Sequence, residues 1–259
     1  MIMTFYKYQG TGNDFVIVDN RLQNIDKTDT KRIAEICDRR FGIGADGFIL
    51  LENDKDVDFK MVYFNADGNE SSMCGNGGRC IVAFAKFLGV IENYTEFIAI
   101  DGLHKAKIEN GTVHLQMQDI SEIEAYDNHQ FLDTGSPHHV EMVSGLSNFE
   151  VKANGAKIRY GQPYNEKGSN VNFVEQLSAE SFAVRTYERG VEDETFSCGT
   201  GVTAVALAMH KSGKTKSNAV SLKTPGGILK VTFNSEENGY NNIWLVGPAK
   251  QVFKGELEW

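Results

Sequence analysis

Two cysteines stand in the same short motif, one in each half of the chain. Cys74 begins the run CGNGGRCIVAFA, Cys198 begins CGTGVTAVALA, and the two lie 124 residues apart in a chain of 259. Each apolar stretch predicts a buried helix. A thiol at a helix start faces N–H groups and a partial positive charge, which lower its pKa and favour a reactive thiolate. Because those N–H groups also hold anions, each motif predicts a poised thiol beside a carboxylate site.

The repeat extends upstream of both cysteines. Asn13 precedes Asn65 by 52 residues in the first half, and Ser136 precedes Glu188 by 52 residues in the second. Each of the four stands beside a glycine-containing turn signal. Together with the two cysteines, these residues make three matched positions in the same order in both halves, which indicates a duplicated chain. The last dozen residues form one extra strand outside the repeat.

Most of the chain consists of short runs that predict strands, several with period-two alternation. Three segments predict helices, namely residues 28–39, 75–88 and 199–210. The second and third helices are apolar on almost every side, so we expect each to be wrapped by a sheet. The prediction is an α+β fold of two pseudo-symmetric duplicated domains, each a mixed or antiparallel curled sheet around a central helix. The first half, near residues 1–118, carries Cys74, and the second, near 119–246, carries Cys198.

Composition excludes several classes of protein. The chain has 26 basic and 35 acidic residues and a net charge of −9, which argues against nucleic-acid binding. No run reaches the roughly 18–20 apolar residues of a membrane span, and the N-terminus lacks the apolar core of a signal peptide, so we expect a cytoplasmic protein. The four cysteines lack the spacing of a zinc site. We expect Cys37 and Cys80 to be core residues.

Paired thiols suit one kind of reaction. A two-fold repeat would place equivalent thiols on opposite sides of a substrate. One thiolate removes a proton from carbon and the other thiol returns a proton to the opposite face, which inverts the stereocentre. The anion sites would stabilise the charge that develops on an amino-acid carboxylate.

The chain resembles the diaminopimelate epimerase family over its full length. The motifs that carry the resemblance are, in chain order, Gly10-x-Gly12-Asn13-Asp14-Phe15, Gly42-Ile43-Gly44-Ala45-Asp46-Gly47, Phe64-Asn65-Ala66-Asp67-Gly68, Met73-Cys74-Gly75-Asn76-Gly77-Gly78-Arg79-Cys80, Gly135-x-Pro137-His138, Asn170-Val171-Asn172-Phe173, Tyr187-Glu188-Arg189-Gly190, Cys198-Gly199-Thr200-Gly201 and Pro225-Gly226-Gly227.

The resemblance implies interconversion of LL- and meso-diaminopimelate, a small-molecule amino acid of lysine and peptidoglycan synthesis, without pyridoxal phosphate or metal. It implies that Cys74 and Cys198 are the acid/base pair and that His138 and Glu188 support proton transfer. It assigns substrate binding to Asn13, Asn65, Gly75, Asn76, Ser136, Asn170, Glu188, Arg189, Gly199 and Thr200. Ser136 stands where many members have asparagine. The resemblance also implies that the C-terminal strand, residues 247–259, returns to the first domain, and that the protein is a homodimer with Phe253 at the contact.

Other functions remain open at this point. The nearest is a racemase or epimerase of another amino acid, of the proline or histidine type, which would use the same paired cysteines. A cysteine hydrolase with a Cys–His pair would explain one cysteine but not two equivalent ones. A non-catalytic ligand-binding or redox-sensing protein is a third class, but the presence of both thiols argues against it.

Overall fold

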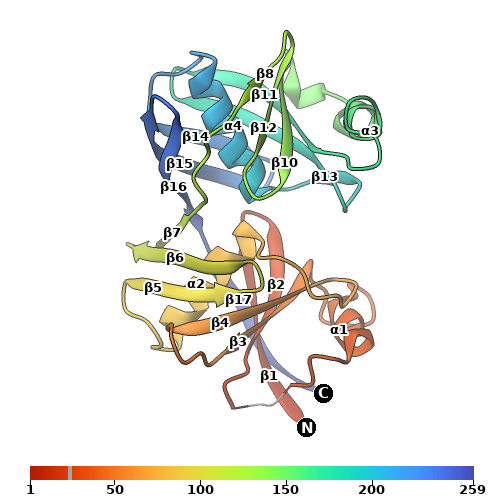
Figure 1. Cartoon of the computed structure of the whole chain (residues 1–259). Helices are drawn as coiled ribbons and strands as arrows, with labels where there is room; N and C mark the ends of the chain where they lie inside the picture. Colours follow the sequence, from red (N-terminus) through yellow and green to blue (C-terminus); the bar gives the residue numbers. More distant parts are fainter. Residues whose placement is uncertain (23–24) are drawn as a thin grey trace. The chain divides into compact units, whose positions relative to one another are not determined.

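The computed structural model describes residues 1–22 and 25–259, and these form two compact units. Unit 1 comprises Met1–Leu115 and Gly247–Trp259, and unit 2 comprises Gln116–Val246 (Figure 1). None of the described helices is long and apolar enough to cross a membrane.

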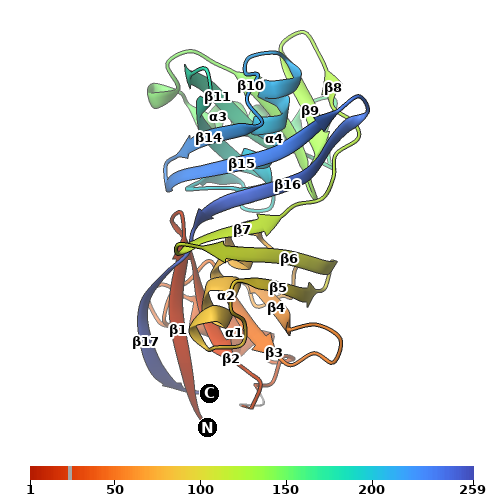
Figure 2. The ribbon, with the colours of Figure 1, turned by 90° about the vertical axis from the view of Figure 1, so that its left-hand side faces the viewer.

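Unit 1 is built on one mixed sheet with the strand order β17-β1-β2-β3-β4-β5-β6-β7. Its strands are β1 (Ile2–Gly10), β2 (Asn13–Asp19), β3 (Gly47–Glu52), β4 (Phe59–Asn65), β5 (Tyr94–Ala99), β6 (Gly102–Glu109), β7 (Thr112–Gln116) and β17 (Lys250–Glu258). The β2–β3 and β4–β5 pairs are parallel and the other neighbours are antiparallel. The C-terminal strand β17 therefore lies beside β1 (Figure 2).

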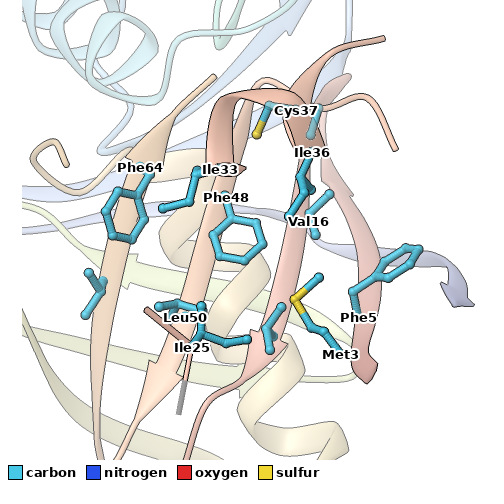
Figure 3. Close-up of a cluster of buried hydrophobic side chains, with 13 residues drawn as sticks. Met3, Phe5, Val16, Ile25, Ile33, Ile36, Cys37, Phe48, Leu50 and Phe64 are labelled. Atoms are coloured by element: carbon cyan, nitrogen blue, oxygen red, sulfur yellow. The ribbon is translucent and has the colours of Figure 1, made fainter. Parts of the chain in front are cut away.

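Both faces of this sheet are covered. The helix α2 (Gly75–Phe87) packs on one face, where a Cβ at Gly77 would lie only 3.3 Å from Ile49 Cδ1. The helix α1 (Thr30–Cys37) covers the other face, and Figure 3 shows its Ile33 and Ile36 in one cluster with Phe48. Because β2 and β3 are buried on both faces, their sequences are continuous apolar runs rather than alternating ones.

Unit 2 repeats this plan with the order β8-β9-β10-β11-β12-β14-β15-β16. Its strands are β8 (Glu124–Ala125), β9 (His129–Asp133), β10 (Pro137–Met142), β11 (Asn170–Ser178), β12 (Ser181–Glu188), β13 (Asp193–Thr195), β14 (Ala219–Thr224), β15 (Gly227–Glu236) and β16 (Gly239–Pro248). The β10–β11 and β12–β14 pairs are parallel, and β13 pairs with β12. The central helix α4 (Gly199–Lys211) contacts β9, β10, β11, β12, β14 and β15.

The main sheets of the two units have the same strand order and the same parallel and antiparallel pairings, and each unit has a central helix. The predicted α+β fold of duplicated domains is therefore confirmed. The buried helices at 75–87 and 199–211 begin where the sequence predicts. The first helix is shorter than predicted and covers residues 30–37. The Asp29 side chain caps its start by accepting a hydrogen bond from the backbone N–H of Arg32, and the extended backbone of Asp38 ends it.

One helix was not predicted. The helix α3 (Val151–Tyr160), preceded by the 3-10 turn at Leu146–Asn148, packs on β11, β12 and β13. Asn154 and Gly155 disfavour a helix interior by propensity. Gly155 is nevertheless required, because a Cβ there would lie 2.3 Å from the Cβ of Tyr187. Tertiary packing therefore overrides local preference in this segment.

Candidate active site

In unit 1 the sheet topology brings predicted residues to one edge. Asn13 begins β2, and β3 runs parallel to it from Gly47. The antiparallel strand β4 ends at Asn65, which pairs with Gly47. Cys74, the residue before α2, also lies at this edge, since its sulfur is 3.6 Å from Asn13 Oδ1. The Asn65 side chain is exposed there.

Cys74 is half-buried and is the N-cap residue of α2. Its thiol donates to Asn13 Oδ1, and the Asn76 amide donates to the same oxygen over 3.2 Å. Three residues that the sequence assigned to substrate binding or catalysis are thus in direct contact.

A network of charges fixes the orientation of the Asn13 amide. Asn13 Nδ2 donates to Asp46 Oδ2 over 2.6 Å, and Arg39 donates to Asp46 Oδ1 over 2.6 Å. Since a carboxylate only accepts hydrogen bonds, the amide nitrogen of Asn13 must face Asp46. The amide oxygen is therefore left facing Cys74.

The same network includes a buried ion pair next to Asn13 in sequence. Asp14 lies 2.7 Å from Lys7 Nζ and 2.7 Å from Arg39 Nη2. Burial alone would raise the pKa of Asp14, but hydrogen bonds from Arg39 and Lys7 lower it to about 2. Asp14 therefore stays ionised and holds both cations at the start of β2.

A fully buried arginine lies beneath the start of α2. The guanidinium of Arg79 donates to Gly75 O over 3.4 Å, to Thr11 Oγ1 over 3.2 Å and to Pro248 O over 3.5 Å. All three acceptors are neutral, and burial lowers the pKa of Arg79. At the equivalent place in α4, Thr203 Oγ1 donates to Gly199 O over 2.9 Å. Unit 1 thus has a cation under its helix start where unit 2 has a hydroxyl.

In unit 2 the buried Asn170, the first residue of β11, holds neighbouring predicted residues in place. Its Nδ2 donates to Ser136 Oγ over 2.8 Å, and its Oδ1 accepts from the backbone N–H of Arg189 over 2.8 Å. Arg189 itself is exposed and donates through Nη1 to Lys167 O. Glu188 ends β12 immediately before it.

Cys198 is buried and is the N-cap residue of α4. Its sulfur accepts from the backbone N–H of Gly201 over 3.4 Å and lies 3.4 Å from Thr200 Oγ1. Thr200 Oγ1 in turn lies 3.0 Å from His138 Nε2. These contacts form a continuous polar chain from a buried imidazole to the sulfur.

His138 is fully buried, and burial together with the charge of Arg189 lowers its pKa to about 3. The imidazole is therefore neutral at neutral pH. Its other ring nitrogen, Nδ1, lies 3.1 Å from the amide nitrogen of Asn172.

The other two cysteines have a different environment. Cys37 and Cys80 are buried, and burial raises the pKa of each thiol to about 12, as expected for core residues. All four cysteines are thiols rather than disulfides. Within residues 1–22 and 25–259, no three His, Cys, Asp or Glu side chains are grouped to hold a metal ion.

Sequence reasoning did not single out Asp46, Arg79 or Asn172 as site residues, although each belongs to a motif of the family resemblance. Their spacing from the cysteines carries no signal on its own. A signal was nevertheless present for two of them, because a charged or amide residue within an apolar run of a buried helix or strand indicates a specific partner.

Solved structures first define the class of fold. The chain superposes over its full length on a phenazine biosynthesis protein of the PhzF family from Bacillus anthracis, with a TM-score of 0.81 and 13% identity. A hydroxyproline epimerase from Agrobacterium vitis gives a TM-score of 0.69 at 14% identity and covers 99% of this chain and 92% of its own. At these identities the likeness shows the fold alone.

Sequence comparison then identifies the family. The family model described as diaminopimelate epimerase matches residues 5–119 and 130–252. The diaminopimelate epimerase of Flavobacterium psychrophilum is 61% identical over 97% of this chain and 99% of its own length. The diaminopimelate epimerase of Chlorobaculum tepidum is 40% identical over 96% of this chain and 98% of its own length. The chain belongs to the diaminopimelate epimerase family, whose members are isomerases.

Proposed function

We propose that the protein is a diaminopimelate epimerase, which interconverts LL- and meso-2,6-diaminopimelate in lysine and peptidoglycan biosynthesis. The observation that carries the proposal is the repeated site: in each unit a cysteine caps the central helix at the same place in the strand order. The 61% identity to a diaminopimelate epimerase over nearly the whole chain supports this substrate.

The proposed chemistry needs two sulfurs acting on one α-carbon. One of Cys74 and Cys198, as thiolate, takes the α-proton: the C–H bond breaks and an S–H bond forms. The other, as thiol, gives its proton to the opposite face of the carbon. No electron is gained or lost overall, and the two roles exchange in the reverse direction. We therefore propose that the reaction proceeds without a cofactor or metal.

The helix starts would stabilise the charge that develops during proton removal. We propose that the backbone at Gly75-Asn76 and at Gly199-Thr200 binds the reacting α-carboxylate, because both segments lie in the first turn of a helix. His138 would support proton transfer at Cys198 through Thr200. Glu188 has the second supporting role that the family motif implies.

We propose that the distal end of the substrate is bound by the remaining predicted residues. The exposed guanidinium of Arg189 suits a carboxylate, and the exposed Asn65 amide suits either polar group. Asn13, Ser136 and Asn170 complete this set. Both donor hydrogens of Asn170 Nδ2 face Ser136 and Pro137 O, so we expect Asn170 to contribute to the substrate only as an acceptor.

Further features of the protein belong to the same proposal. We propose that residues 1–118 and residues 119–246 arose by duplication, and that residues 247–259 are one extra strand, outside the repeat, that belongs to the first domain. We also propose a cytoplasmic homodimer, with Phe253 at its contact. Phe253 is 46% exposed on β17 and packs edge-on against Phe5, as expected of an aromatic side chain available to a second copy.

The test is epimerisation in deuterated water. Reduced protein is incubated with LL-diaminopimelate, with no added pyridoxal phosphate, while α-deuterium and the meso isomer are measured. Wild type should form deuterated meso isomer. Cys74→Ala and Cys198→Ala should each lose turnover by about 10²–10⁴-fold. Cys37→Ala, which removes a buried core thiol, is the matched control and should remain active.

The alternatives give different results. No exchange with diaminopimelate, but exchange with proline or 4-hydroxyproline, would contradict the proposed substrate and favour a racemase of the other type. Full activity in either cysteine variant would contradict the two-thiol reaction itself.

A further inference from the structure

The buried amide of Asn172 makes three hydrogen bonds that fix its orientation. Asn172 is fully buried in β11. Its Nδ2 lies 2.9 Å from the carbonyl oxygen of His139 and 3.1 Å from His138 Nδ1, while its Oδ1 accepts from Thr186 Oγ1 over 3.0 Å. A carbonyl oxygen can only accept a hydrogen bond, so the atom facing His139 O must be the NH₂ group. The NH₂ group therefore also faces the His138 ring.

This orientation decides which nitrogen of His138 carries hydrogen. Since Asn172 donates to Nδ1, that nitrogen must be an acceptor and bears no hydrogen. A neutral imidazole then holds its single hydrogen on Nε2, which faces Thr200 Oγ1 at 3.0 Å. Protonation of Nδ1 would place two N–H groups against each other, so Asn172 also opposes the imidazolium form.

The hydrogen bond continues to the sulfur. When Thr200 Oγ1 accepts from His138 Nε2, its own hydroxyl hydrogen is left to donate elsewhere. The Cys198 sulfur lies 3.4 Å away and already accepts from the backbone N–H of Gly201. Two donors directed at one sulfur favour its thiolate form.

The duplication supplies an internal control for this polar chain. In unit 1, Phe15, Ile49 and Tyr63 occupy the places that His138, Asn172 and Thr186 occupy in unit 2. The registers match, because Ile49 pairs with Tyr63 just as Asn172 pairs with Thr186.

The packing against the central helix matches as well. A Cβ at Gly77 would lie 3.3 Å from Ile49 Cδ1, and a Cβ at Gly201 would lie 2.5 Å from Asn172 Oδ1. The same fold is therefore built in unit 1 with the apolar side chains of Phe15 and Ile49 at the places of His138 and Asn172. Buried polar groups cost stability unless they are fully bonded, so packing alone does not account for the polar set in unit 2.

We propose that Asn172 is a positioning residue that fixes His138 as its Nε2–H tautomer, so that the Thr200 hydroxyl donates to the Cys198 sulfur. The tautomer follows from the contacts alone, whereas its effect on turnover rests on the proposed function. Asn172 acts through His138 and Thr200 and does not itself touch the sulfur.

The tautomer is tested by NMR of protein carrying ¹⁵N-labelled histidine. Long-range proton–nitrogen correlations distinguish the two neutral tautomers and the imidazolium, and the His138→Gln variant assigns the signals. We expect wild type to show hydrogen on Nε2 and none on Nδ1 from pH 7 down to pH 5. Hydrogen on Nδ1 at pH 7 would overturn the proposal. This measurement needs no variant of Asn172 to fold.

The consequence for catalysis is tested with two variants. Asn172→Asp offers a carboxylate to Nδ1 and should move the hydrogen to that nitrogen or charge the ring, whereas Asn172→Leu removes the partner and should give a mixture of tautomers. Each should lower kcat by roughly 10- to 100-fold, the usual effect of losing an orienting partner, with little change in KM. Alkylation of Cys198 at neutral pH should slow in both. Asn53→Asp, the same change at an exposed position, should alter none of these.

Failure of this inference differs from failure of the proposed function. An active enzyme with hydrogen on Nδ1, or with unchanged kcat in both Asn172 variants, would refute the inference alone. An Nε2–H tautomer in a protein that does not epimerise diaminopimelate would refute the proposed function and leave the tautomer in place.

Discussion

Arg79 is a charge placed in the interior of unit 1, and the three acceptors of its hydrogen bonds, Gly75 O, Thr11 Oγ1 and Pro248 O, are neutral. A buried cation is costly unless an opposite charge is near. Its guanidinium bonds to Gly75 O, the carbonyl next to Cys74. We infer that the compensating charge is the anion that forms at this helix start, either the Cys74 thiolate or the carboxylate of the substrate.

The variant Arg79→Met replaces the guanidinium with a shorter, unbranched and uncharged side chain. Alkylation of Cys74 by iodoacetamide at neutral pH should slow, because loss of the nearby positive charge makes the thiolate less favourable. The rate is measured by mass spectrometry of the Cys74 peptide. The Cys198 peptide of the same sample is the control and should be unaffected, and equal slowing at both cysteines would contradict the inference.

The sequence identifies site residues that belong to a recognisable motif, but not those that only the folded structure brings into contact. Cys74 and Cys198 were found because a helix start follows from an apolar run and its glycines, whereas Thr200 was assigned through the family resemblance. The position of Asn172 against His138 depends on the parallel register of β10 and β11, in which Val140 pairs with Asn172. Nothing local in either strand specifies that register, so this contact could not be predicted.

Equivalent turns follow β4 in unit 1 and β12 in unit 2, and each contains a glycine with a left-handed backbone. Gly68, after β4, has φ +86°, and Gly190, after β12, has φ +95°. The two turns differ in their surroundings: a Cβ at Gly68 would lie 1.9 Å from Thr30 O, whereas a Cβ at Gly190 would meet nothing within 4 Å. Comparison of the two turns therefore distinguishes the cost of a left-handed backbone, which both share, from the cost of a steric clash, which only Gly68 has.

Alanine at these two glycines should have unequal effects. Gly190→Ala should lower the free energy of unfolding by about 1–2 kcal/mol, the cost of left-handed backbone for a residue with a Cβ. Gly68→Ala carries the same cost and must also displace the start of α1, so its loss should be larger. Urea unfolding of both variants measures the difference, and equal losses would show that the Thr30 contact relaxes without penalty.

At the level of elements, prediction succeeded where pattern and packing agree. The helices α2 and α4 are apolar nearly all round, and both begin at the glycine that follows the cysteine, where the sequence predicts. The hairpin from β6 to β7 turns at Asn110-Gly111, a residue pair typical of tight hairpins, and both residues have positive φ. The helix α3 was missed because Gly155 weakens its pattern while serving a contact with Tyr187 that only the tertiary structure reveals.

The buried titratable groups of the two units respond differently to acid. In unit 2, burial lowers the pKa of His138 and of His139 to about 3, with His129 adding to the effect at His139. The unfolded chain takes up these protons below about pH 6.5, while the folded unit does not until about pH 3. The free energy of unfolding of unit 2 therefore falls as the pH falls through this range. In unit 1 the contribution of Asp14 is lost only below about pH 4.

Unit 2 should therefore become unstable before unit 1 on mild acidification. Between pH 7 and pH 5 the two histidines should remove up to about 4 kcal/mol from the stability of unit 2. Hydrogen exchange, corrected for the intrinsic pH dependence and resolved by peptide, should show protection falling in α4 and β10 but not in α2 and β2. Loss of protection in both units together, or in neither, would contradict this expectation.

The pairing of β17 with β1 has a consequence for the order in which a nascent chain can fold. Unit 2 is one continuous stretch of sequence and can close as soon as residue 246 has been synthesised. Unit 1, although most of it is made first, lacks its edge strand until residues 250–258 emerge. Until then β1 presents an unpaired edge, the kind of surface on which strands of other chains add. Most of unit 1 is thus synthesised before unit 2 but is completed after it, and a chain truncated between residues 246 and 250 would contain all of unit 2 and a sheet in unit 1 with an open edge.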